Sequence, residues 1–246
     1  MKIRKYFKSI FALLILIGSI VWFGYSELTK SEISGSINQT DKIVVIFDFD
    51  GVICDSFKQF IQIFNDISPC YSLTKVSNED LDDIHKYETE HVFKKHGVSS
   101  WKMPVVVYHL KRNMKQLIPT LKLYKGIKET IEELISKGII VGILTSNSQE
   151  IVNAFLKNND LIGFQFIFSG SGIFGKTKNL KFVKDKLGAK NIFYVGDEVR
   201  DVKAANEANV QSIAVTWGFH SKKLLESSSP KAIVDNPSDL IAIVSK

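Results

Sequence analysis

Cysteine is scarce in this chain: only Cys54 and Cys70 occur in 246 residues. Two cysteines exclude a disulfide framework, and they match no cysteine-based metal-binding pattern. Arrays of basic residues with interleaved aromatics are also lacking, so the net charge of +6 does not indicate nucleic-acid binding. A hydrophobic content of 45% with 24% charged residues excludes a disordered chain. The length allows one sizeable domain with an appended element.

The first 30 residues form a unit of their own. Basic residues precede an uncharged, largely apolar run from Ser9 to Tyr25, whose length is at the lower end of the about 17 to 25 residues that span a bilayer. No Ala-x-Ala-like site follows the run, which favours an uncleaved transmembrane helix over a cleaved signal peptide. By the positive-inside rule, the main domain is expected outside the cytoplasm, although the side is not fixed. The sequence thus predicts a single-pass membrane location, with residues 31–42 as a polar linker.

Apolar runs alternate with amphipathic segments from residue 43 onward. The predicted strands are Ile43–Phe47, Ile139–Leu144, Phe164–Phe168, Ile192–Val195, Ser212–Val215 and Ala232–Val234. The predicted helices between them are Gly126–Lys137, Gln149–Lys157, Lys178–Leu187, Asp201–Ala208 and Lys222–Glu226. This alternation predicts a doubly wound α/β domain, with helices on both faces of a parallel sheet. Because ligands bind beyond the carboxyl ends of such strands, functional residues are expected there.

Two carboxylates, Asp48 and Asp50, follow the first predicted strand. Side chains at positions i and i+2 of a strand point to the same side, so the two carboxylates converge while Phe49 turns away. Gly51 lets the backbone turn sharply and bring its amides toward a ligand. Converging carboxylates suit divalent-metal binding and acid–base chemistry. Cys54 lies nearby, and a buried side chain explains it better than a catalytic thiol; the sequence leaves open whether Cys54 and Cys70 pair.

Three further polar groups follow later strands or lead into a helix. They are Thr145–Ser146–Asn147, then Lys176, then Gly196–Asp197 with Asp201 downstream. Each group alone fits a helix cap, a surface lysine or a turn. Their joint occurrence in this order, at these positions, favours a functional site.

The four groups together resemble the motifs of the haloacid dehalogenase superfamily, over roughly residues 43 to 235. Gly175 and Lys176, together with the Gly-Asp-Glu-x-Arg-Asp stretch that begins at Gly196, resemble its phosphoglycolate-phosphatase-like subgroup. The resemblance implies that Asp48 is a nucleophile that forms an aspartyl-phosphate, and that Asp50 is the general acid and base.

The same resemblance assigns roles to the later groups. It implies that Thr145 and Lys176 bind and neutralise the transferring phosphoryl group, and that Gly51, Ser146 and Asn147 contact the substrate. It also implies a Mg²⁺ ion held by Asp48, Asp197 and the backbone carbonyl of Asp50, with Asp201 supporting this acidic cluster. Two placements stay open, because Ser146 can replace Thr145 and Lys178 can replace Lys176 in the pattern.

The residue types suit phosphoryl transfer. A carboxylate can attack a phosphoryl group only if cations offset the charge on its oxygens, and Mg²⁺ prefers oxygen ligands. Within the superfamily, the dehalogenases lack an acid at the position of Asp50, since halide needs no proton. The presence of Asp50 therefore indicates a phosphatase or a phosphomutase.

The segment between the first two motifs, residues 57–124, resembles the helical cap of one superfamily branch, which leaves 43–56 and 125–246 as the α/β core. The sequence thus predicts a magnesium-dependent phosphatase, anchored in a membrane, that acts on a small phosphorylated metabolite such as phosphoglycolate. The alternatives are a sugar phosphomutase and an inactive membrane-anchored scaffold. The complete set of acidic residues argues against the scaffold, because burying carboxylates without a metal is costly.

Overall fold

Six parallel strands form the central sheet of this protein. The structure, a computed structural model, describes residues 42–170 and 175–245. The strands are β1 (Ile43–Phe47), β4 (Ile140–Leu144), β5 (Phe166–Phe168), β6 (Asn191–Gly196), β7 (Gln211–Val215) and β8 (Ala232–Val234). Their residues are almost continuously apolar, as expected for strands covered on both faces. In β1, for example, Val44 to Phe47 are all fully buried.

The strand order is β5-β4-β1-β6-β7-β8. Strands β4 and β5 therefore lie on one side of β1, and β6, β7 and β8 lie on the other. The register aligns the strand ends, because Phe47 of β1 pairs with Ile143 of β4 and with Val195 of β6. The residues that follow these three strands therefore meet at one level. This position is the topological switch point, where open α/β sheets bind ligands.

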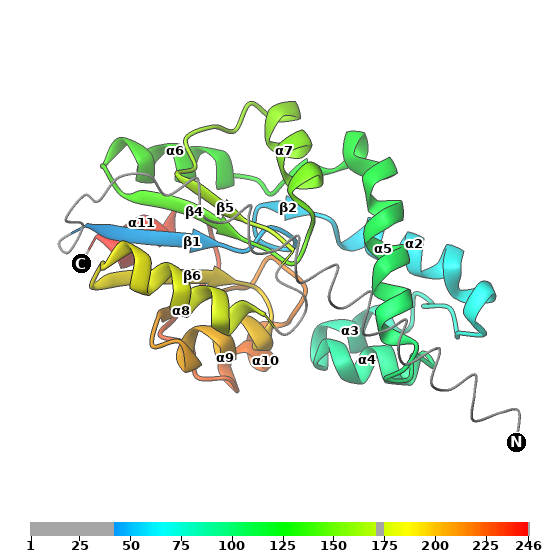
Figure 1. The fold of residues 1–246 in the computed structure, drawn as a ribbon. Helices are drawn as coiled ribbons and strands as arrows, with labels where there is room; N and C mark the ends of the chain where they lie inside the picture. Colours follow the sequence, from blue (N-terminus) through cyan, green and yellow to red (C-terminus); the bar gives the residue numbers. More distant parts are fainter. Residues whose placement is uncertain (1–41, 171–174, 246) are drawn as a thin grey trace, which may run out of the picture. The chain divides into compact units, whose positions relative to one another are not determined.

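Helices cover both faces of the sheet (Figure 1). They are α6 (Ile127–Ser136), α7 (Gln149–Asn158), α8 (Lys176–Leu187), α9 (Val199–Glu207), α10 (Lys222–Glu226) and α11 (Asp239–Val244). Helices α8 and α9 pack together on one face, and α6 and α11 pack together on the other. Their buried residues recur at helical spacing, as with Ile127, Ile131 and Leu134 in α6, which is why these segments form amphipathic helices.

A second group of helices lies beyond the carboxyl ends of the strands (Figure 1). It is inserted between two short antiparallel strands, β2 (Cys54–Asp55) and β3 (Lys122–Leu123). We call its members the inserted helices: α2 (Phe57–Ile67), α3 (Leu81–Lys86), α4 (Thr89–Lys95) and α5 (Met103–Leu117), with the 3-10 turns Ser68–Tyr71 and Ile118–Thr120. Helices α2 and α5 pack against each other. The strands β2 and β3 thus form the two connections between the inserted helices and the rest of the domain.

The predicted α/β sheet is confirmed, and its six strands differ from the predicted runs only at their ends. The helix predicted from Lys178 begins at Lys176, and the helix predicted from Asp201 begins at Val199. In the second case a capping box extends the helix: Glu198 and Asp201 accept hydrogen bonds from each other's backbone amides.

The predicted membrane location is contradicted. Within residues 42–170 and 175–245, no helix combines the length and apolarity needed to cross a bilayer. The longest helix of this part, α5, has 15 residues, whereas a spanning helix needs about 20. The segment 1–30, which suggested the anchor, and most of the linker 31–42 lie outside the described residues.

The two cysteines are free: Cys54 is buried and Cys70 is exposed. Burial raises the pKa of the Cys54 thiol well above its ordinary value. The thiol therefore stays protonated, and Cys54 is a buried core residue, as the sequence suggested.

Candidate active site

The site is built at the end of β1, where Asp48 and Asp50 line the same cavity. The ring of Phe49 points away from them and packs edge-on against Phe155 of α7, with the ring centroids 5.1 Å apart. Asp48 is buried, and its Oδ1 accepts a hydrogen bond of 2.8 Å from the Phe49 amide. The alternation predicted from the strand pattern is therefore present.

A buried ammonium group bridges two carboxylates. Lys176 Nζ donates to Asp48 Oδ2 and to Asp201 Oδ1, both at 2.5 Å. Burial alone lowers the pKa of Lys176, but the carboxylates of Asp201 and Asp48 outweigh burial and hold this pKa well above its ordinary value. The ammonium is therefore charged. Lys178, the alternative in the sequence pattern, is exposed.

Three acidic side chains lie close enough to share a cation. Oxygen atoms of Asp48, Asp197 and Asp201 lie within 4.8 Å of one another, and all three residues are buried. Oδ1 of Asp197 has no hydrogen-bond partner in the described structure. Burial, followed by the nearby Glu198 and Asp201, raises the pKa of Asp197 well above its ordinary value. An orphaned carboxylate oxygen in an acidic cluster fits a hard divalent cation such as Mg²⁺.

Two glycines leave room for Asp197. A Cβ atom added to Gly51 would lie 2.0 Å from Asp197 Oδ2, and one added to Gly218 would lie 2.3 Å from Asp197 Cβ. Gly51 also has a φ of +78°, a conformation that other residues adopt at a cost. Oδ2 is held in place because it accepts a hydrogen bond of 2.7 Å from the Phe219 amide. The position of Asp197 thus depends on the absence of side chains on both sides.

Gly51→Ala is therefore expected to destabilise the fold more than a positive φ alone would. Gly138 provides the matched control, because its φ is +77° but an added Cβ would meet nothing within 4 Å. Gly138→Ala should cost about 1–2 kcal/mol from backbone strain, and Gly51→Ala about 1–3 kcal/mol more from the clash. Urea unfolding of both variants measures this difference. Equal losses of stability would show that Asp197 is not held as tightly as described.

Asp50 is oriented by two donors. Ser56 Oγ donates to its Oδ1 at 2.8 Å, and Asn147 Nδ2 donates to its Oδ2 at 3.1 Å. Burial outweighs these hydrogen bonds and raises the pKa of Asp50. Its carboxylate is not part of the three-carboxylate cluster formed by the described residues. The side chain of Asp50 therefore has a different environment from that of Asp48.

The hydroxyls after β4 are placed differently from each other. Thr145 is fully buried, and its Oγ1 accepts a hydrogen bond of 3.0 Å from the Asn147 amide. Ser146 lines the cavity, and its carbonyl oxygen accepts a hydrogen bond of 2.5 Å from Lys111 Nζ. Lys111 belongs to α5, so this bond joins the inserted helices to the sheet.

Several polar residues of the site were not predicted as functional. Glu198 is buried and accepts hydrogen bonds from Thr89 Oγ1 of α4 and from the Arg200 guanidinium. Burial opposes ionisation of Glu198, but the charges of Arg200 and His220 prevail and lower its pKa to about 2. Glu198 and Arg200 lie within the Gly-Asp-Glu-x-Arg-Asp stretch, which was a usable signal. Thr89 is distant in sequence, and no local pattern indicates its contact.

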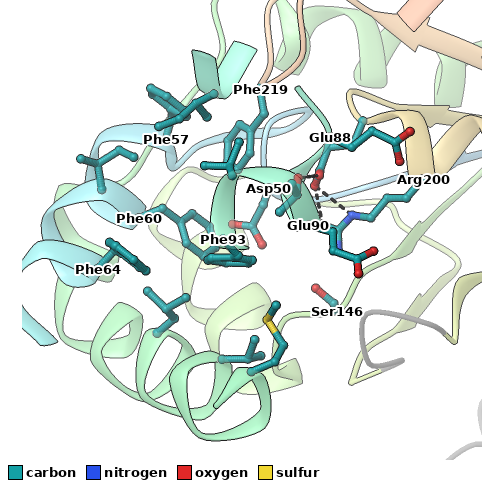
Figure 2. Close-up of a pocket in the computed structure, with 18 of the residues that line it drawn as sticks. Asp50, Phe57, Phe60, Phe64, Glu88, Glu90, Phe93, Ser146, Arg200 and Phe219 are labelled. Carbon is teal, nitrogen blue, oxygen red and sulfur yellow. Dashed lines mark hydrogen bonds and ion pairs between the residues drawn. The ribbon is translucent and has the colours of Figure 1, made fainter. Parts of the chain in front are cut away.

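A cavity of about 450 Å³ extends from Asp48 and Asp50 into the inserted helices. Phenyl rings gather on one side of it, and charged side chains, among them Glu88, Glu90 and Arg200, lie on the other (Figure 2). Its size is within the range of small-molecule sites. The site is thus a pocket with carboxylates at the sheet and an apolar interior.

Fold and site together define an α/β enzyme whose carboxylates and buried lysine meet at the switch point of a parallel sheet. The family model described as haloacid dehalogenase-like hydrolase matches residues 45–215. The chain therefore belongs to the haloacid dehalogenase-like hydrolase family, as the sequence motifs predicted.

Known proteins of this kind are similar over most of the chain. A phosphoglycolate phosphatase from Synechococcus elongatus is 30% identical over 205 residues, which are 82% of this chain and 97% of that protein. Pyrophosphatase PpaX from Bacillus mycoides is 24% identical and covers 82% of this chain and 96% of its own length. A haloacid dehalogenase-like hydrolase structure from Streptococcus pneumoniae has a TM-score of 0.69 at 20% identity, covering 82% of this chain and 98% of that one. Family and relatives support a phosphatase.

Proposed function

We propose that this protein is a magnesium-dependent phosphatase that hydrolyses a small phosphate monoester through an aspartyl-phosphate on Asp48. The observation that carries the proposal is the position of Lys176 Nζ between Asp48 and Asp201. A carboxylate nucleophile needs positive charge beside it when it approaches a phosphoryl group. The buried ammonium provides this charge without reorganisation of water.

In the first step, Asp48 attacks phosphorus and the bond from phosphorus to the ester oxygen breaks. The Phe49 amide and Lys176 hold the Asp48 carboxylate in one orientation, which favours a productive approach. A Mg²⁺ ion bound by Asp48, Asp197 and Asp201, with the backbone carbonyl of Asp50, would neutralise charge on the phosphoryl oxygens. Thr145, or Ser146 in its place, and Asn147 are proposed to bind the phosphoryl group from the end of β4.

Asp50 is proposed to protonate the leaving oxygen and then to take a proton from the attacking water. Its raised pKa increases the protonated fraction near neutral pH, which an acid catalyst needs. Ser56 and Asn147 fix the direction of its carboxyl group. Water attack on the aspartyl-phosphate then releases inorganic phosphate and restores Asp48.

The inserted helices are proposed to act as a cap over this site. Hydrogen bonds join this segment to the α/β core, among them those from Thr89 to Glu198, from Lys111 to the Ser146 carbonyl, and from Lys203 to Glu88. The last pair is exposed and contributes little to stability. A cover of this kind limits the access of bulk water to the phosphoryl group while Asp48 attacks.

Metal-dependent release of phosphate tests the proposal. The purified full chain should release inorganic phosphate from p-nitrophenyl phosphate or phosphoglycolate with Mg²⁺ present, and a chelator should lower the rate at least about 100-fold. Added Mg²⁺ in excess of the chelator should restore it. Absence of release from a broad panel of phosphate esters would overturn the phosphatase proposal. Transfer of phosphate to a second substrate position, without release, would instead indicate a phosphomutase.

A further inference from the structure

The cavity above Asp48 and Asp50 is lined by apolar stripes of three inserted helices. Helix α2 contributes Phe57, Phe60, Ile61 and Phe64, and helix α5 contributes Met103, Pro104, Val107, Leu110 and Met114. Val92 and Phe93 of α4 also line it, and so do Val76, Ile84 and Phe219. In α2 and α5 the spacing is helical, so each helix presents one apolar face to the cavity. Figure 2 shows Phe57, Phe60, Phe64 and Phe93 on the same side of it.

The charges around the cavity disfavour a second anionic group on the substrate. The acidic lining residues are Asp48, Asp50, Glu88, Glu90 and Glu198; the lysine and arginine of the lining are Lys111 and Arg200, and its histidines are His96 and His220. Both cations have partners: Arg200 pairs with Glu198, and Lys111 donates to the Ser146 carbonyl. Among the described lining residues, Lys111 is the only lysine or arginine on the three helices that carry the apolar stripes. A carboxylate or second phosphate placed among the apolar stripes would lose its hydration, and the one lysine on those helices already donates to the Ser146 carbonyl.

We propose that the substrate is a phosphate monoester of an uncharged, apolar alcohol, whose hydrocarbon part fills the cavity between α2, α4 and α5. This inference rests on the proposed phosphatase function and narrows its substrate class. The phosphoryl group lies at Asp48, and the ester oxygen receives a proton from Asp50. The alcohol then leaves as a neutral molecule into an apolar pocket. Phosphoglycolate and pyrophosphate, whose leaving groups are anionic, are poorer substrates of this chain.

A series of n-alkyl phosphates tests the proposal, because only the length of the hydrocarbon changes. From ethyl to butyl to hexyl phosphate, kcat/KM should rise about fourfold per added methylene until the cavity is filled. Phosphoglycolate should be hydrolysed less efficiently than butyl phosphate, which has a similar size and no carboxylate. A flat or falling series, or phosphoglycolate as the better substrate, would overturn the inference while leaving the phosphatase proposal intact. No turnover of any ester, p-nitrophenyl phosphate included, would overturn both.

Val107→Phe tests where the hydrocarbon part of the substrate binds. Val107 of α5 lines the cavity, so the larger side chain should shorten it and lower the hexyl-to-ethyl ratio of kcat/KM by about tenfold or more. Val105→Phe is the matched control, because Val105 belongs to the same helix but does not line the cavity. It should keep the ratio of the unmodified protein. Because the ratio compares two substrates of one sample, partial unfolding of a variant does not change it. Equal ratios in the two variants would place the hydrocarbon elsewhere and overturn the assignment of the cavity.

Discussion

Asp48→Asn is expected to lower kcat for phosphate-ester hydrolysis by about 10⁴-fold or more, the loss typical of removing a catalytic nucleophile. The asparagine amide carries no negative charge and does not attack phosphorus. It also removes one of the three buried carboxylates that lie within reach of a shared cation. The effect combines lost nucleophilicity with weaker metal binding, and steady-state kinetics with p-nitrophenyl phosphate measures it.

The control for this variant is Asp55→Asn, in the neighbouring strand β2. Asp55 is exposed, so the same chemical change there should leave kcat within about twofold. Circular dichroism should show that both variants are folded, since asparagine keeps the shape of aspartate. A folded Asp48→Asn protein that retains activity within about tenfold of the unmodified protein would rule out Asp48 as the nucleophile.

Lys176→Met should remove activity and weaken the fold together. Without the ammonium, the carboxylates of Asp48 and Asp201 remain buried with no cation between them, a change that costs about 3–5 kcal/mol in comparable buried pairs. Loss of the charge that faces the phosphoryl group should lower kcat by about 10²–10³-fold. Urea unfolding in the presence of a chelator measures the first effect, and phosphate release with saturating Mg²⁺ measures the second.

Lys178→Met is the matched control, on the same helix and two residues away. Lys178 is exposed, so its replacement should change stability by less than about 0.5 kcal/mol and leave kcat unchanged. The pair of variants also distinguishes the two lysines that fit the sequence pattern. Loss of activity in Lys178→Met alone would show that the sequence motif had been aligned on the wrong lysine.

Much of the fold followed from local patterns in the sequence. Buried strands such as β1 and β6 are nearly continuous apolar runs, and polar residues begin where each strand ends. Because the strands are parallel, their ends had to meet at one edge. Asp48, Asp50 and Asp197, which follow β1 and β6, were therefore predictable as neighbours, whereas Lys176 at the start of α8 was predicted from the resemblance to the family's motifs.

The remaining parts of the site depend on contacts between distant segments. The bond from Thr89 to Glu198 links residues 109 positions apart, and the bond from Lys111 to the Ser146 carbonyl joins α5 to the end of β4. Neither contact leaves a periodic signal. The inserted helices were recognised as helical, but which faces line the cavity depends on how α2, α4 and α5 pack. The membrane location failed because it rested on the N-terminal segment alone.

The most direct test of the account is to trap the phosphorylated enzyme. The Asp50→Asn variant should hydrolyse its aspartyl-phosphate slowly, because it lacks the base that activates water. Reduction with borohydride during turnover of p-nitrophenyl phosphate, followed by peptide mass spectrometry, should convert Asp48 to homoserine. The same treatment should leave Asp55 unchanged. Modification of another residue, or no modification while phosphate is released, would contradict the proposal that Asp48 is the nucleophile.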